Sequence, residues 1–227
     1  MADPSERSVW QATDGYEAYV GRWSRPLAEL VLAWFAAPAG GRWVDVGRGT
    51  GALTAAVLAT SDPVAVVGID PSPAFFGAAH VAILDPRVRF ELGDACALPV
   101  ASDSYDAVVA GLVLNYVENP AAAVAEMARA SRPAGAVGAY VWDFRGEMRQ
   151  RARYFWEAVA AMDPVAAELD PRPHFHSCEP EPLAALFRGA GWATWRSRRS
   201  TSRWRSGTST TFGDRTPWPE RPLRSAP

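Results

Sequence analysis

The sequence predicts a single doubly wound α/β domain, in which helices cover both faces of a mostly parallel sheet. Short apolar runs alternate along the chain with segments of helical periodicity, and this alternation is typical of parallel strands joined by helical crossovers. The 227 residues are enough for one sizeable core and fewer than two independent cores usually need. A hydrophobic content of 48% beside 21% charged residues is ordinary for a globular protein.

Five apolar runs predict the strands of this sheet. They cover residues 41–47, 64–70, 87–92, 105–112 and 136–142. Helices are expected at residues 25–37, 50–60, 73–84, 119–131, 153–162 and 181–191. Asn119 and Pro120 have the chemistry of a helix start, and Pro133 with Gly135 is expected to end that helix before the fifth strand begins.

The charge and the cysteine content point to a protein of the cytoplasm that acts on a small molecule. A net charge of -2 gives no general attraction to nucleic acid or to anionic lipid. The first residues do not form a basic region followed by an apolar run, and no later run is long enough to span a membrane. Cys96 and Cys178 lie far apart in the sequence, which suits a reducing compartment.

The most informative motif is VDVGRGTG, residues 44–51, which follows the first strand directly and opens a helix. The backbone amides of such a turn face outward at a helix N-terminus and suit a polar, partly anionic ligand. Gly47, Gly49 and Gly51 allow the main chain to turn tightly and to approach that ligand. Taken alone, the motif also fits the dinucleotide pattern GxGxxA through Ala52, or a turn that binds nothing.

Two acidic side chains after the next strands narrow the choice. Asp70 ends the second strand, where a carboxylate accepts hydrogen bonds from ribose hydroxyls. Asp94 lies just beyond the third strand, where a short acidic side chain can accept from an adenine amino group. Each carboxylate alone is more simply a helix cap or a solvated loop residue. The ordered set, with the fourth strand ending at the same crevice, favours a ligand that contains adenosine.

These pieces resemble the class I methyltransferases, in particular those of ubiquinone and menaquinone biosynthesis. The resemblance rests on VDVGRGTG, VVGIDPSP, VRFELGDACALP and DSYDAVVAGLVLNYV and runs from about Tyr16 to Gly191. It implies a Rossmann-like fold, S-adenosylmethionine as cofactor and methyl transfer to a small molecule. One residue departs from the family pattern, because Arg48 stands where this group usually has cysteine. Its side chain is expected to point outward and to reduce cofactor affinity at most.

The resemblance also implies a set of cofactor-binding residues. The glycines of the turn are expected along the methionine part, Asp70 at the ribose, and Asp94 with Ala95 at the adenine. Residues 14–26 resemble a segment that closes over the cofactor in related enzymes, although its aromatic side chains can equally pack on the sheet. The full set is Asp45, Gly47, Gly49, Gly51, Asp70, Pro71, Asp94, Ala95, Gly111, Tyr16 and Arg22.

Methyl transfer from a sulfonium is an in-line displacement, in which alignment supplies much of the acceleration without a metal or a covalent intermediate. If the acceptor is a hydroxyl or an amine, a base is required. Asp143 after the fifth strand and Tyr116 after the fourth are the candidates by location, although a role in a loop or in packing explains each more simply. Asn115 is not followed by the two prolines that adenine-directed DNA methyltransferases carry, so nucleic acid is not expected as the acceptor.

Three alternatives remain open at this point. The GxGxxA pattern suits a nicotinamide-dependent oxidoreductase, although Asp45 and the Asp94 motif speak against it. A second alternative is a non-catalytic cofactor-binding remnant of a methyltransferase. The alternating His174, His176 and Cys178 allow a zinc site, but a polar loop explains them more simply, because three ligands this close rarely complete such a site.

The last residues differ in composition from the rest. We expect residues 1–192 to form the domain, with residues 1–40 as a helical cap, and residues 193–227 to be an atypical tail rich in Arg, Ser and Pro. The tail reads as translation in a shifted frame, because Leu223 is its single aliphatic side chain beyond alanine. The C-terminal strands of the family are therefore expected to be missing, which leaves the fifth strand at a sheet edge. The acceptor and the oligomeric state are not predicted.

Overall fold

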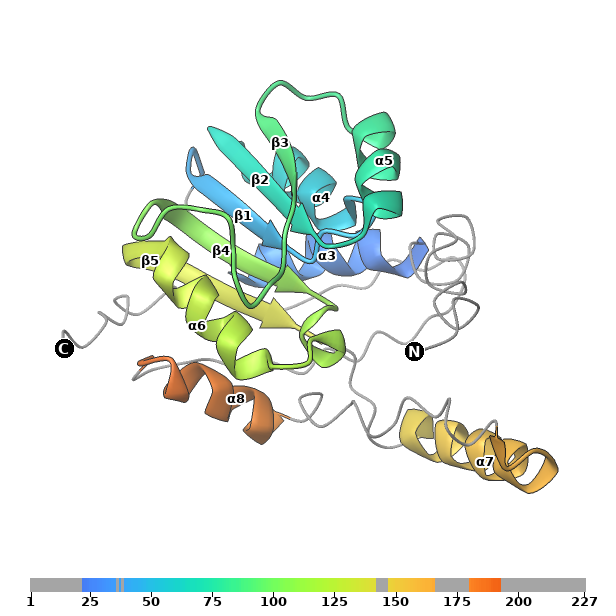
Figure 1. Ribbon diagram of the computed structural model, residues 1–227. Coiled ribbons are helices and arrows are strands. Elements are labelled where there is room, and N and C mark those ends of the chain that lie inside the picture. Colours follow the sequence, from blue (N-terminus) through green and yellow to red (C-terminus); the bar gives the residue numbers. More distant parts are fainter. Residues whose placement is uncertain (1–21, 36, 38, 142–146, 166–179, 193–227) are drawn as a thin grey trace.

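The computed structural model describes residues 22–35, 37, 39–141, 147–165 and 180–192. Its centre is a parallel sheet of five strands in the order β3-β2-β1-β4-β5 (Figure 1). The strands are β1 (Arg42–Val46), β2 (Ala65–Asp70), β3 (Val88–Leu92), β4 (Tyr105–Gly111) and β5 (Ser131–Tyr140). The helices are α3 (Arg22–Phe35), α4 (Ala52–Thr60), α5 (Pro73–Ala82), the short η3 (Leu114–Tyr116), α6 (Pro120–Ala130), α7 (Glu147–Met162) and α8 (Pro180–Gly189).

The predicted doubly wound α/β class is confirmed, and each predicted strand and helix overlaps an observed one. β5 differs from the expectation, because it begins at Ser131 directly after α6 and includes Pro133 and Gly135. The register shifts between Tyr105 and Ala107 of β4, so these residues lie in an irregular start of the strand. Proline has no N–H to donate to a regular ladder, but it is tolerated there because the pairing is irregular. Among the described strands, β3 and β5 form the two edges.

One face of the sheet carries α3, α4 and α5. Its core contains Trp43 of β1, Leu32 and Phe35 of α3 and Val57 of α4, all buried. Along β1 the side chains alternate, so Trp43 and Asp45 face these helices. Because α3 begins at Arg22, Pro26 lies inside this helix, where proline removes one N–H from the hydrogen-bond ladder.

The opposite face is covered by α6 and α8. Buried side chains from β1, β2 and β4 pack there against Met127 of α6 and Phe187 of α8. The sequence sets the start of α6, because the Asn119 side chain accepts a hydrogen bond from the amide of Ala122 at 3.0 Å and Pro120 follows directly.

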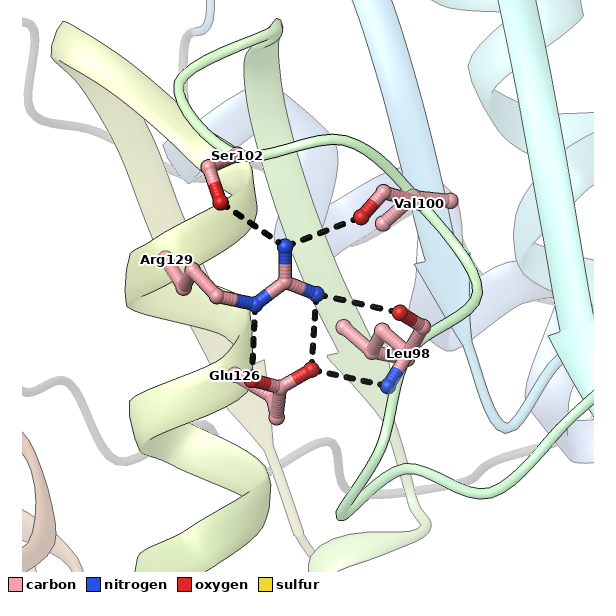
Figure 2. A network of polar contacts seen from close by, with 5 residues as sticks. All are labelled: Leu98, Val100, Ser102, Glu126 and Arg129. Atoms are coloured by element: carbon pink, nitrogen blue, oxygen red, sulfur yellow. Dashed lines mark hydrogen bonds and ion pairs between the residues drawn. The ribbon is translucent and has the colours of Figure 1, made fainter.

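A polar network attaches α6 to the loop before β4 (Figure 2). The Arg129 guanidinium donates to the carbonyls of Leu98 and Val100 and pairs with Glu126, whose carboxylate accepts from the amide of Leu98. Figure 2 shows these groups and Ser102 arranged around the rim of the guanidinium. The network therefore fixes the loop that leads into the fourth strand.

The helix α7 lies apart from the sheet in Figure 1. Tyr154 and Phe155 on it are exposed. Among the described helices, none is long and apolar enough to cross a membrane. The tail of residues 193–227, and with it the expected loss of further strands, lies outside the described residues.

Candidate functional site

The glycine turn joins the carboxyl end of β1 to the start of α4. Gly47, Gly49 and Gly51 have φ values of 68°, 55° and 96°, in the left-handed region that favours glycine. The amides of Gly47 and Arg48 both donate to the carbonyl of Ile69, at 2.8 and 3.1 Å. The turn therefore passes directly over the end of β2.

Two of these glycines are also required by contacts within the protein. A Cβ on Gly47 would lie 2.3 Å from Cγ2 of Val113, and one on Gly51 would lie 2.7 Å from Cδ1 of Ile83. Gly111 at the end of β4 is equally confined, because its Cβ would lie 2.5 Å from the hydroxyl of Tyr140. Close packing accounts for these glycines whether or not a ligand is bound.

Asp45 lies beneath the turn and is 2% exposed. Its Oδ2 accepts a hydrogen bond of 2.6 Å from the Thr54 hydroxyl of α4, while its Oδ1 is buried and has no partner among the described residues. Burial raises the pKa of Asp45 to about 6, against the opposing effects of the Thr54 hydrogen bond and the Arg48 charge. A buried carboxylate oxygen without a donor marks a position where a ligand donor would be favourable.

Asp70 closes β2 and is 7% exposed. Its Oδ2 accepts from the amide of Gly49 and its Oδ1 from the amide of Ser72, both at 2.9 Å. Each carboxylate oxygen retains a second lone pair after these bonds. Asp70 therefore connects the glycine turn to the start of α5 and is still able to accept from a ligand.

A small cavity of about 20 Å³ lies between the turn and the ends of β4 and β5. By size it holds little more than one water molecule. Seven of its ten lining residues lie outside the predicted cofactor-binding set. Tyr140 is one of them, and the register of β4 with β5 places it opposite Gly111. The cavity is lined by Ser24, Asp45, Gly47, Arg48, Thr50, Ala52, Leu53, Gly111, Leu112 and Tyr140.

The expectation for Arg48 is wrong, because its side chain turns inward and the residue is 3% exposed. Nη1 donates to the carbonyl of Gly49 at 2.8 Å and Nε to the carbonyl of Gly68 at 3.3 Å. The guanidinium carbon lies 4.8 Å from the ring centre of Phe90 and 5.4 Å from that of Phe76. Burial lowers the pKa of Arg48, against the opposing charges of Asp70 and Asp45.

The loop after β3 contains Asp94 and Ala95, and the hydrogen bond of Asp94 is made within this loop. Asp94 is exposed, and its Oδ1 accepts a hydrogen bond of 2.8 Å from the amide of Cys96. Ala95 beside it is buried, and the amide of Gly93 donates to the carbonyl of Asp70 at 3.2 Å. The two loops therefore lie side by side at the carboxyl edge, although the contacts of Asp94 are those of a self-capped turn. Pro71 follows Asp70 at the surface.

The candidates for the acceptor side are only partly described. Tyr116 lies in η3 and is 54% exposed. Its neighbour Asn115 is buried, and neither atom of its side-chain amide has a partner among the described residues. Arg22 begins α3. The other candidates, Tyr16 and Asp143, lie outside the described residues, as do His174, His176 and Cys178 of the zinc alternative.

Comparison with known proteins supplies the family. The methyltransferase domain family matches residues 44–138, the segment from the glycine turn to β5. A demethylmenaquinone methyltransferase of Roseiflexus sp. (strain RS-1) is 30% identical over 206 residues, which cover 85% of this chain and 86% of that protein. The chain belongs to the S-adenosylmethionine-dependent methyltransferases. This membership decides against the nicotinamide-dependent oxidoreductase.

Two further relatives agree with this result. A methyltransferase of Mycobacterium tuberculosis is 33% identical over 159 residues, which cover 70% of this chain and 61% of that protein. The crystal structure of an S-adenosylmethionine-dependent methyltransferase from Methanococcus maripaludis superposes with a TM-score of 0.60 at 19% identity, over 86% of this chain and 90% of that one. At this identity the superposition speaks for the fold, and the Rossmann-like class I fold expected from the motifs is thereby confirmed.

Proposed function

We propose that this methyltransferase transfers a methyl group from S-adenosylmethionine to a small, partly apolar acceptor by in-line displacement. The observation that carries the proposal is the buried Asp45 beneath a glycine turn, with one carboxylate oxygen unpartnered among the described residues and a cavity beside it. The name of the Roseiflexus relative supports an apolar acceptor, because demethylmenaquinone is one.

The methionine part fits the donors and acceptors around Asp45. An ammonium group would supply the hydrogen bond that Oδ1 lacks, and a positive charge would favour the ionised form of this buried carboxylate. The cavity of about 20 Å³ is smaller than a methionine moiety, so its lining side chains must move apart on binding. Tyr140 is one of these side chains and ends β5, an edge strand among the described strands.

The adenosine part fits the edge formed by the loops after β2 and β3. The free lone pairs of Asp70 would accept from the ribose hydroxyls, while its amide contacts hold the carboxylate in place. Asp94 and Ala95 lie on the adjacent loop and would contact the adenine. Pro71 follows Asp70 at this edge, whereas Gly111 ends β4 and lines the cavity beside Asp45. Tyr16 and Arg22 are proposed to contact the cofactor from the N-terminal segment.

When bound, S-adenosylmethionine supplies an electrophilic methyl group on a sulfonium. The residues of this chain would hold the donor rigidly, because alignment of nucleophile, methyl and sulfur provides much of the acceleration. Tyr116 follows β4 at the same edge and is exposed, so it is the described candidate for accepting a proton from the acceptor. Asp143 is the second candidate.

The test is a calorimetric titration of the full chain with S-adenosylmethionine, S-adenosylhomocysteine and NADH in separate experiments. We expect micromolar binding of the first two and none of NADH. Absence of binding by both sulfur ligands would overturn the proposal. Turnover of a quinol or another small acceptor then distinguishes an enzyme from a non-catalytic remnant, which would bind tightly and transfer nothing.

A further inference from the structure

Arg48 is held in a way that a packing residue does not require. Its guanidinium bridges two backbone carbonyls, one in the glycine turn and one on β2, and it lies against the rings of Phe76 and Phe90. Gly68 makes room for it, because a Cβ there would lie 2.6 Å from Cδ of Arg48. Its Nη2 is buried without a partner among the described residues, an arrangement that costs stability.

The two contacts of Gly49 connect Arg48 to Asp70. The carbonyl of Gly49 accepts from Arg48 at 2.8 Å, and the amide of Gly49 donates to Oδ2 of Asp70 at 2.9 Å. Gly49 is thus held at both its polar groups, in a left-handed conformation with φ of 55°. The amide and the carbonyl of Gly49 belong to successive peptide planes, so the two contacts together restrain both φ and ψ of this residue. If Arg48 releases the carbonyl, the Gly49 backbone can relax from its left-handed conformation, and the amide that holds the Asp70 carboxylate then shifts with it.

We propose that Arg48 is a positioning residue for the cofactor, which acts through Gly49 to orient the Asp70 carboxylate. The inference rests on the proposed function, since Asp70 is taken to bind the ribose. A cysteine at this position, which the resemblance gives as usual, would be too short to reach either carbonyl. The acidic groups that counter the guanidinium charge are Asp70 and Asp45.

The test is a double-mutant cycle on the affinity for S-adenosylhomocysteine, with the variants Arg48→Met, Asp70→Asn and both together. Arg48→Met should weaken binding roughly tenfold, which is the loss of about one charge-assisted hydrogen bond. If Arg48 acts through Asp70, the double variant should bind within about twofold of Asp70→Asn alone, because both substitutions then remove the same interaction with the ligand. A residue that contributes to binding independently of Asp70 would instead give additive losses, and one that only stabilises the fold would leave the affinity unchanged.

Arg129→Met is the matched control, because Arg129 also donates to two loop carbonyls but lies on α6, away from the turn. It should lower the thermal midpoint and leave the affinity unchanged. If Arg48→Met gives no cooperative unfolding transition, the cycle is run with Arg48→Lys, which keeps the charge but lacks the fork that spans both carbonyls.

Additive losses in the cycle, or an Arg48→Met variant that binds like the wild type, would overturn the inference. Both results require a wild-type protein that binds S-adenosylhomocysteine. A wild type that does not bind would overturn the proposed function itself, so the two failures are distinguishable.

Discussion

Two arginine networks hold loops at the carboxyl and amino ends of this sheet, and they differ in how completely their groups are satisfied. The α6 network is formed by Arg129 and Glu126 with the loop residues Leu98, Val100 and Ser102. In it, Arg129 makes a two-point ion pair with Glu126, at 2.7 Å for each contact, and donates to two carbonyls and a hydroxyl. Its side chain is 33% exposed, so water also solvates the charge.

The turn network, formed by Asp45, Arg48, Gly49 and Asp70, is deeply buried and incomplete. Oδ1 of Asp45 and Nη2 of Arg48 have no partner among the described residues. Such groups cost free energy unless something else satisfies them. The comparison teaches that the α6 network has the properties of scaffolding, whereas the turn network has those of a site completed by a ligand.

The largest loss of ligand binding is expected from Gly49→Val, a substitution within the turn network. The variant should abolish measurable S-adenosylhomocysteine binding, because a branched side chain is strained at φ of 55° and would enter the space of the ligand. The measurement is isothermal titration calorimetry. Gly40→Val is the control, since Gly40 has φ of 77° with open space around it and lies at the other end of β1. Normal binding by Gly49→Val would make the turn purely structural.

Asp45→Asn should separate stability from binding. Burial holds the pKa of Asp45 at about 6, above its ordinary value of 3.8, so the folded protein binds the proton more tightly than the unfolded chain. The contribution of Asp45 to stability therefore falls as the pH rises from about 4 to 6 and is constant above that. Removing the charge should stabilise the protein at pH 7.5 by up to about 3 kcal/mol, given 1.4 kcal/mol per pKa unit.

The same variant should bind S-adenosylmethionine more weakly. Wild-type affinity should also fall below about pH 6 as Asp45 takes up a proton, while the affinity of Asp45→Asn should not follow this titration. Thermal unfolding and calorimetry from pH 5 to 8 measure both properties. A variant that is less stable at pH 7.5 and binds normally would remove Asp45 from the site.

Asp70→Ala should weaken S-adenosylhomocysteine binding by on the order of 1.5 to 3 kcal/mol, through the loss of charge-assisted hydrogen bonds to the ribose. The loss includes the release of the Gly49 and Ser72 amides, which the carboxylate also holds. Asp94→Ala serves as a comparison, because its carboxylate caps a local turn and is exposed. Unchanged affinity in Asp70→Ala would withdraw the ribose assignment.

The fold and the turn were predictable because their signals are local. Strand and helix alternation fixed the order of elements, and the motif at residues 44–51 placed the glycines at the carboxyl end of β1. The direction of Arg48 was not predictable, because the space that it fills is created by Gly68 on β2 and bounded by Phe76 on α5. Tyr140 was missed for a similar reason, since only the pairing of β4 with β5 sets it opposite Gly111.

The smallest effect on binding is expected from Arg129→Met, which tests whether the α6 network is only scaffolding. The variant removes the Arg129 donor from the Glu126 carboxylate and from the carbonyls of Leu98 and Val100. The carboxylate still accepts from the amide of Leu98, and the Leu98 carbonyl still accepts from the amide of Val100. We therefore expect a loss of about 1 kcal/mol in the free energy of unfolding, as for one or two partly exposed hydrogen bonds. Urea unfolding measures this loss, and the affinity for S-adenosylhomocysteine should stay the same. A marked fall in affinity would mean that the loop before β4 transmits strain to the turn through β4, and the two networks would then have to be treated as one.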